Sequence, residues 1–151
     1  MHVSEIIDGK GSLIISVLPG DSVEEASKVL RRAGIGAVLV MDEKGGMAGI
    51  LSERDIVQGI ADHGAEILAG PVSRLMTSEV ETTSPGATVD DLMEQMVSGS
   101  IRHLPVMEDE ALVGIVSVSD VVKNGMHELR AVRDTLHSYI GQSSVRSVEQ
   151  D

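Results

Sequence analysis

Two segments of the sequence each carry a serine followed, three residues later, by an aspartate. The pairs are Ser52 and Asp55, within GILSERD, and Ser117 and Asp120, within GIVSVSD. A serine hydroxyl donates and accepts hydrogen bonds, and an ionised aspartate accepts them from hydroxyl groups, so each pair could hold a polar ligand. The same spacing is that of a helix N-cap and its third helical residue, so each pair could equally close its own helix.

The rest of the sequence offers little other chemistry. There is no cysteine, which excludes disulfides, thiolate catalysis, zinc fingers and iron–sulfur clusters. No nucleophile elbow, Walker loop, Rossmann fingerprint or acid/base pair of carboxylates is evident. His2, His63, His127 and His137 show no spacing that converges on a metal, and we expect them at the surface. We therefore predict neither a catalytic residue nor a metal site.

The chain is acidic, with a formal net charge of −12. Such a surface repels phosphate backbones and anionic lipids, so nucleic acid and membrane are poor candidate partners. No apolar run reaches the roughly 18–20 residues that span a bilayer, and the N-terminus lacks the regions of a signal peptide. We expect a cytoplasmic protein. With no Trp, no Phe and one Tyr, its core must be built from aliphatic residues and methionine.

A unit of roughly 65 residues occurs twice along the chain. PGDSVEE at 19–25 returns as PGATVDD at 85–91, 66 residues later. The two serine–aspartate segments, 49–55 and 114–120, lie 65 residues apart. This duplication predicts two copies of one supersecondary unit.

Apolar spacing and turn residues predict the order β-α-β-β-α in each copy. In the first copy we expect strands at 13–17, 37–41 and 47–51, a helix capped by Ser22 that stops at Gly34, and a helix at 53–61. In the second copy we expect strands at 80–83, 103–107 and 112–116, a helix at 89–98, and a helix from about 118.

A further amphipathic helix has no counterpart after the first copy. It is marked by Met126, Leu129, Val132, Leu136 and Tyr139 or Ile140. The predicted organisation is a first repeat at 1–63, a connection at 64–71, a second repeat at 72–125, this helix at 126–140 and a flexible tail at 141–151. The fold class is α/β in the broad sense, with an α+β arrangement of small sheets.

The duplicated segments GILSERD and GIVSVSD, together with IRHLPV at 101–106, resemble the motifs of a tandem pair of CBS domains, named after cystathionine β-synthase. The resemblance covers about residues 3–125 and extends to the stand-alone bacterial CBS-pair proteins. It implies two pseudo-symmetric repeats that bind an adenosine nucleotide in clefts between them. In that family an aspartate binds the ribose, because its carboxylate can accept hydrogen bonds from the two ribose hydroxyls.

Carried over to this sequence, the resemblance implies two clefts, each built from both repeats. The first cleft would be formed by Asp120 with Ile115, Ser117 and Ser119, and with Leu18, Val23, Ile35, Gly36 and Ala37. The second would be formed by Asp55 with Ser52 and Arg54, and with Ser84, Val89, Ile101, Arg102 and His103.

Three of these residues are candidates for phosphate contacts, because an anionic ligand of an acidic protein needs local positive charge. They are Arg54, Arg102 and His103. The alternative for each arginine is a solvated surface position, and His103 could instead be a partly buried strand residue. The two clefts should differ, since Gly36 and Ala37 of one copy correspond to Arg102 and His103 of the other.

We predict a regulatory protein that senses AMP, ADP, ATP or NAD(H) and signals occupancy to an unknown partner. The apolar stripe of the last helix, which a single chain would leave partly exposed, predicts a homodimer. Two alternatives remain open. One is a structural dimerisation module with empty clefts, and the other is a nucleotide hydrolase or transferase that uses Asp55 or Asp120.

Overall fold

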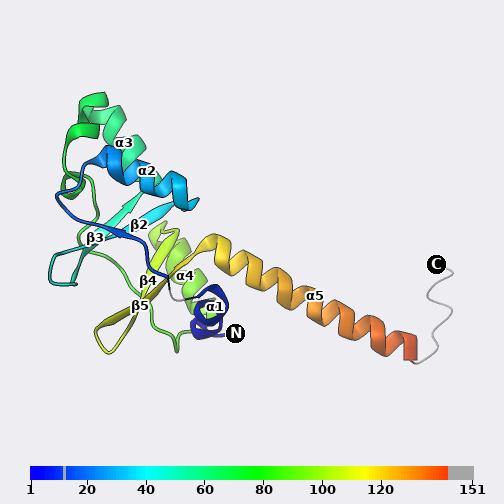
Figure 1. Ribbon diagram of the computed structural model, residues 1–151. Helices are drawn as coiled ribbons and strands as arrows, with labels where there is room; N and C mark the ends of the chain where they lie inside the picture. Colours follow the sequence, from blue (N-terminus) through cyan, green and yellow to red (C-terminus); the bar gives the residue numbers. More distant parts are fainter. Residues whose placement is uncertain (12, 143–151) are drawn as a thin grey trace.

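Two small sheets organise the chain, which the computed structural model describes over residues 1–11 and 13–142 (Figure 1). The first unit consists of β1 (Ser16–Val17), α2 (Val23–Ala33), β2 (Ala37–Met41), β3 (Met47–Ser52) and α3 (Glu53–His63). The second consists of α4 (Val89–Gly99), β4 (His103–Glu108), β5 (Ala111–Ser117) and α5 (Val118–Gln142). Before them lies α1 (Val3–Lys10), and two 3-10 turns, η1 (Ala65–Ala69) and η2 (Val72–Arg74), connect the units.

The hairpins of the two units have the same register, which confirms the internal repeat. In the first sheet, ordered β1-β2-β3, the strands β2 and β3 are antiparallel and pair Ala37 with Ser52. In the second sheet, β4 and β5 are antiparallel and pair His103 with Ser117. Each hairpin therefore brings the serine of its serine–aspartate pair to the start of the following helix. The predicted α+β class is confirmed.

The helices that precede the hairpins are capped in the same way. The Ser22 hydroxyl accepts a hydrogen bond of 3.0 Å from the Glu25 amide, as the sequence predicts. At the equivalent place in the second unit, the Thr88 hydroxyl accepts one of 3.1 Å from the Asp91 amide. Each cap satisfies one amide that a helix N-terminus otherwise leaves unpaired.

Each unit has its own aliphatic core, as a sequence without Trp or Phe requires. The first core is built from Val17, Val23, Ala26, Leu30, Val38, Val40, Leu51, Ile56 and Val72. The second is built from Val3, Ile6, Leu92, Met96, Leu104, Val106, Val116 and Val121. Each core therefore includes residues that precede the other unit in the sequence. Val3 and Ile6, at the start of the chain, belong to the second core, and Val72, which opens the second copy, belongs to the first.

Matched backbone hydrogen bonds hold each of these leading segments on the opposite unit. At the second unit, Val3 N donates to Ala87 O at 2.9 Å, Ser4 N to Pro85 O at 3.0 Å, and Val89 N to Met1 O at 3.0 Å. At the first unit, the bonds are Val72 N to Asp21 O at 2.8 Å, Ser73 N to Pro19 O at 3.0 Å, and Val23 N to Gly70 O at 3.0 Å. The two copies are thus interlocked and not merely placed side by side.

The leading segments also explain the glycine that opens each serine–aspartate motif. A Cβ atom at Gly49 would lie 2.6 Å from Thr77 O, and one at Gly114 would lie 2.6 Å from Ile7 Cδ1. Both distances are far shorter than a van der Waals contact. At Gly49 the neighbouring atom is backbone, so only glycine lets the segment from the opposite copy approach this closely. At Gly114 it is the end of the Ile7 side chain, which would have to shift to admit a Cβ atom.

The predicted first strand of each copy is shorter than expected. Only Ser16 and Val17 of 13–17 pair with β2, and Leu13 is 84% exposed. In place of a strand at 80–83, Thr83 forms a single parallel bridge with Val106, at the position where Val17 pairs with Val40 in the first copy.

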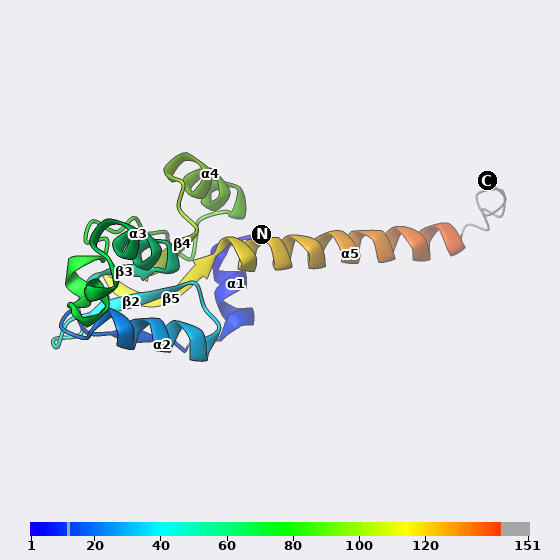
Figure 2. The same cartoon turned by 90° about the horizontal axis from the view of Figure 1, so that it is seen from above.

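The helix predicted at 126–140 is wrong as a separate element, because α5 runs without a break from Val118 to Gln142, over 25 residues. In the first copy, Gly64 with φ of 80° ends α3. Leu129 occupies the corresponding place in α5, and no proline intervenes, so nothing stops the helix. Figures 1 and 2 show α5 leaving the body of the molecule. The predicted tail lies outside the described residues from 143 onward, as does the side chain of Tyr139.

The C-terminus of α4 yields a prediction about stability. Gly34 ends α2 in the left-handed conformation with φ of 66°, and Ser100 ends α4 with φ of 52°. A side chain is strained there, whereas glycine is not. We therefore expect Ser100→Gly to stabilise the fold by about 1 kcal/mol. Urea denaturation followed by circular dichroism measures the change.

Gly34→Ser is the matched reverse substitution, since no neighbouring atom lies within 4 Å of the Cβ position at Gly34. It should destabilise the protein by a similar amount. Equal stability of both variants and the wild type would contradict this account of the two helix ends.

Candidate functional site

Both serine–aspartate pairs close the helices that they begin. Ser52 N donates to Asp55 Oδ2 at 2.9 Å, and Asp55 N donates to Ser52 Oγ at 3.2 Å. The second copy has the same two bonds, from Ser117 N to Asp120 Oδ2 at 2.9 Å and from Asp120 N to Ser117 Oγ at 3.2 Å. The capping interpretation is confirmed. It leaves room for a ligand, because a carboxylate offers about four acceptor positions and a capping box uses only part of them.

The start of each of these helices is tied to the residue before the neighbouring strand. Glu53 N donates to Gly36 O, and Val118 N donates to Arg102 O, both at 2.9 Å. Backbone geometry therefore places Gly36 beside the first serine–aspartate pair and Arg102 beside the second. Both candidate carboxylates are half-buried.

The two repeats meet where β2 and β4 begin. A Cβ atom at Gly36 would lie 3.2 Å from Cε1 and 3.5 Å from Nε2 of His103, with Glu53 Oε1 at 3.7 Å. His103, a residue of the second repeat, therefore packs directly against the first repeat. The sequence assigned His103 to the Asp55 cleft, but the structure also places it close enough to Asp120 for that carboxylate to act on it electrostatically.

The environment of His103 disfavours its charged form. Burial lowers the pKa of the imidazole, and the nearby Lys10 ammonium and Arg102 lower it further. The carboxylates of Asp120 and Glu53 act in the opposite direction and do not compensate. A neutral imidazole at this junction can accept as well as donate a hydrogen bond.

Lys10 is a component of the site that the sequence analysis missed. Its ammonium lies 2.6 Å from Asp120 Oδ2 and 2.8 Å from Ile115 O. Burial of Asp120 raises the pKa of the carboxyl, but the hydrogen bonds from Lys10 and Ser117 outweigh this and hold the pKa below its ordinary value. Lys10 ends α1, far from Asp120 in the sequence. The loose similarity of residues 3–7 to 72–76 was the available signal that α1 takes part in the repeat.

The remaining predicted residues fall into three groups. Val23 and Ala37 are buried in the first unit, with Val23 fully enclosed. The half-buried residues are Ile35, Gly36, Ser52, Val89, Ile101, Ile115 and Ser117. The exposed residues are Leu18, Arg54, Ser84, Arg102 and Ser119. In the part of the chain that the structure describes, no hydrogen bond or ion pair joins Asp55 to the second repeat.

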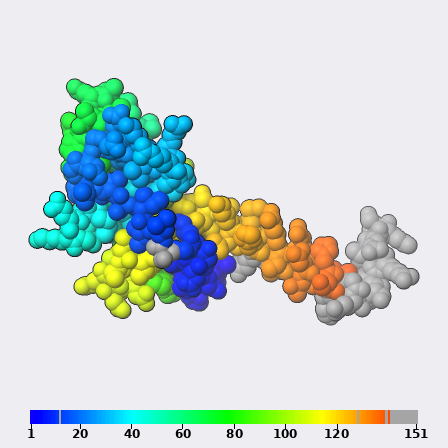
Figure 3. Space-filling model, in the orientation of Figure 1, coloured from blue at the N-terminus to red at the C-terminus, as the bar shows by residue number. Residues whose placement is uncertain are grey.

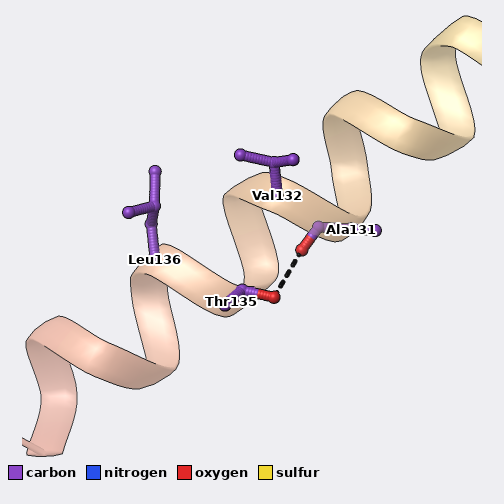
Figure 4. Close-up of a pocket in the computed structure, with 4 residues that line it drawn as sticks. All are labelled: Ala131, Val132, Thr135 and Leu136. Carbon is purple, nitrogen blue, oxygen red and sulfur yellow. Dashed lines mark hydrogen bonds between the residues drawn. The ribbon is translucent and has the colours of Figure 1, made fainter.

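Two apolar surfaces lie outside this site. A shallow hollow of about 510 Å³ between α2 and α3 is lined by Ser27, Leu30, Arg31, Gly34, Ile35, Glu53, Ile56 and Val57. On α5, Val132 and Leu136 project from the same side of the helix, next to Thr135, whose hydroxyl donates to Ala131 O at 2.9 Å (Figure 4). Figure 3 shows α5 as an arm that protrudes from the body.

Over residues 1–11 and 13–142, no three histidine, aspartate or glutamate side chains are grouped as a metal site would need. In the same part of the chain, no helix combines the length and apolar character needed to cross a bilayer.

A duplicated β-α-β-β-α unit with interlocked leading segments and two matched serine–aspartate helix starts defines a tandem pair of small α/β repeats. The family model described as "CBS domain" matches the chain twice, at residues 12–62 and 72–127. The chain therefore belongs to the CBS-domain family, and the resemblance drawn from its motifs is confirmed.

Relatives include both short and longer proteins. The mitochondrial CBS domain-containing protein CBSX3 of Arabidopsis thaliana is 35% identical, over 80% of this chain and 60% of its own length. The CBS domain-containing protein YhcV of Bacillus subtilis is 30% identical, over 82% of this chain and 87% of its own length. The chain thus spans most of the length of one relative and less than two thirds of the other.

Solved structures of CBS proteins have the same fold. A CBS-domain containing protein from Agrobacterium tumefaciens is 43% identical, with a TM-score of 0.80 over 81% of this chain and 91% of that chain. The CBS domain pair of protein MJ0100 is 26% identical, with a TM-score of 0.75 over 85% of this chain and 98% of that chain. That pair was solved in complex with 5′-methylthioadenosine and S-adenosyl-L-methionine.

The environment of His103 yields a prediction about pH. Because folding lowers the pKa of this imidazole, the unfolded chain binds a proton more readily at His103 than the folded protein does. Stability from this group is present above about pH 6.5, the ordinary histidine pKa, and is lost as the pH falls towards the lower folded value. Replacing His103 with Gln should therefore reduce the loss of stability between pH 7.5 and 5.5.

Urea denaturation at each pH measures the slope. His127→Gln, at an exposed position on α5, is the matched control and should retain the wild-type slope. If the His103→Gln protein lost stability as steeply as the wild type over this range, the burial of His103 would not be the source.

Proposed function

We propose that the protein is a non-catalytic sensor of adenosine nucleotides. In this proposal Asp55 and Asp120 accept hydrogen bonds from the ribose hydroxyls of AMP, ADP, ATP or NAD(H). Occupancy of the clefts is then signalled to a partner protein. We propose that the protein acts in the cytoplasm.

The observation that carries the proposal is the matched geometry of the two serine–aspartate pairs at the junction of a CBS pair. Each carboxylate is half-buried and fixed by a backbone amide, so it is preorganised to accept a further hydrogen bond. The adenosine compounds bound by the pair of MJ0100 support an adenosine-containing ligand for a chain with this fold.

The two alternatives have different support. A dimerisation module with empty clefts is favoured by the exposed apolar stripe on α5, which is consistent with a partner whether or not a ligand binds. A hydrolase or transferase would need a group that activates water or stabilises a leaving phosphate. Within the described residues, neither serine–aspartate pair has a histidine base in hydrogen-bond contact with the serine.

The direct test is calorimetric titration of the purified protein with adenosine and guanosine nucleotides, including NAD(H). The proposal requires saturable binding of an adenosine ligand, with no turnover of that ligand over hours. Binding of none of them would support the structural module, and release of a reaction product would support the enzyme.

The two clefts should contribute unequally to binding. We expect Asp120→Ala to weaken adenosine nucleotide binding by about ten- to hundredfold, because each lost hydrogen bond to a charged acceptor costs about 1.5–3 kcal/mol. Asp55→Ala should weaken it less, since Arg102, which can attract an anionic nucleotide, lies beside the Asp120 pair, whereas Gly36 lies beside the Asp55 pair. Calorimetric titration of both variants with AMP measures the difference.

Both substitutions remove the same capping bond, and Asp120→Ala also removes the contact with the Lys10 ammonium. Melting curves should show a loss of about 1 kcal/mol from the cap in each variant, and a larger total loss for Asp120→Ala. A larger loss of affinity from Asp55→Ala would reverse the proposed ranking.

We further propose that the protein is a homodimer, with the apolar stripe of α5 at the interface. Met126, Leu129, Val132, Leu136 and Ile140 are between 41% and 71% exposed. Their spacing of three or four residues places most of them along one face of the helix, which is typical of helices that pair with another helix. Val122, on the same helix, is 50% exposed and extends the apolar stripe toward the body.

Replacing Leu129 and Leu136 with Ser should therefore produce a monomer, because it removes the most exposed part of the stripe. The double substitution of His127 and Asp134 with Ser, on the same helix but outside the stripe, should leave the dimer intact. Light scattering coupled to gel filtration measures the mass. A wild-type monomer at tens of micromolar would contradict the proposed dimer, and a dimer of the leucine variant would place the interface elsewhere.

A further inference from the structure

The Asp120 site contains a cation that belongs to neither hairpin. Lys10 Nζ donates to Asp120 Oδ2 and to Ile115 O, and so joins the end of α1 to the last strand of the second repeat. The lysine side chain remains 38% exposed, whereas the aspartate side chain is 16% exposed. The lysine side chain is therefore more accessible to a ligand from solvent than the aspartate side chain is.

Among the described residues no cation is paired with Asp55 in the first repeat, although the leading segment of that repeat is held by equivalent backbone bonds. At the position equivalent to Ile115, Ile50 O accepts a hydrogen bond of 2.9 Å from Thr77 N. A backbone amide thus takes the place that the Lys10 ammonium takes in the second repeat. Aligning the leading segments through Val3 and Val72 makes Glu79 the counterpart of Lys10. The duplication has produced opposite charges at corresponding positions.

Two cations and two carboxylates meet on the Asp120 side of the junction. Lys10 and Arg102 act on His103 to lower its pKa, and Asp120 and Glu53 act to raise it. On a protein with a net charge of −12, the two cations offset the two carboxylates, so an anionic group next to Asp120 meets less repulsion here than over most of the surface. The Asp120 carboxylate attracts the Lys10 ammonium, but the same carboxylate repels a phosphate group. A cation beside it is therefore needed if the same cleft is to accept a phosphate.

We propose that Lys10 makes the Asp120 cleft selective for ligands that carry a phosphate next to the ribose, and that the Asp55 cleft lacks this selectivity. The inference rests on the proposed function, because it requires that Asp120 binds a ribose. Among the described hydrogen bonds, those to the Asp120 carboxylate engage Oδ2, so Oδ1 is left to accept a ribose hydroxyl. Lysine has a flexible stem and three rotatable donors, so its ammonium can contact the phosphate while it stays near the carboxylate.

The experiment compares AMP with adenosine, which differ only in the phosphate. Each is titrated against the wild type and the Lys10→Met variant, and binding is followed through the NMR amide signals of Ser117 and Asp120, so that this cleft is observed by itself. We expect Lys10→Met to weaken AMP binding by about tenfold or more, because a charge-assisted hydrogen bond is lost. Adenosine binding should change by less than about threefold, since adenosine offers the ammonium no charged group.

Two further variants separate charge from structure. Lys10→Arg keeps the cation and should keep the preference for AMP over adenosine, even if α1 is slightly displaced. Lys44→Met, the same substitution in the turn between β2 and β3, should leave both affinities unchanged.

The outcomes distinguish this inference from the function on which it rests. If the wild type bound neither AMP nor adenosine, the proposed function would fail and the inference with it. If the wild type bound both, and Lys10→Met weakened the two equally or not at all, the sensor would stand. Lys10 would then be only a structural tie between α1 and the second repeat.

Discussion

Six backbone hydrogen bonds, three at each repeat, hold the leading segment of one copy on the other, and the rest of the molecule depends on them. They bring Val3 and Ile6 into the core of the second unit and Val72 into the core of the first. Without this exchange each small sheet would lack part of its apolar cover. A repeat of this size buries too little surface to be stable alone, so the interlocking makes two marginal units into one cooperative structure.

The exchange also determines the chemistry of the motifs. Gly49 and Gly114 leave room for the opposite copy's segment, which lies against them. The serine and aspartate that follow begin a helix at the place where the hairpin ends, and the carboxylate is held by a backbone amide. The same aspartate therefore caps a helix and could bind a ligand. The cap fixes one oxygen of the carboxylate, which orients the other.

On this symmetric frame the side chains differ between the two copies. Gly36 of the first repeat accommodates the imidazole of His103 from the second, whereas the residue that corresponds to Gly36 in the second repeat is the much larger Arg102. Lys10 lies at Asp120, whereas a backbone amide lies at the corresponding place in the first repeat. Asp120 is also in the first turn of α5, whose far end carries the exposed apolar stripe. A ligand held by Asp120 and a protein partner held by the stripe would thus act on one continuous helix.

Much of the molecule was determined by the sequence alone. The 66- and 65-residue offsets, the caps at Ser22 and Ser52, the two hairpins and the CBS family all follow from residues that interact with near neighbours in the chain. Local hydrogen bonds and apolar periodicity can be predicted from the sequence because they depend on residues a few positions apart. The strand predicted at 80–83, by contrast, is reduced to a single bridge between Thr83 and Val106, and the separate helix at 126–140 required a stop signal that α5 does not contain. Only the tertiary structure decided that α1 packs on the second repeat, that Lys10 meets Asp120 across about a hundred residues, and that His103 faces Gly36. These are contacts between distant segments, and no short-range pattern specifies which surface of one copy the other will meet.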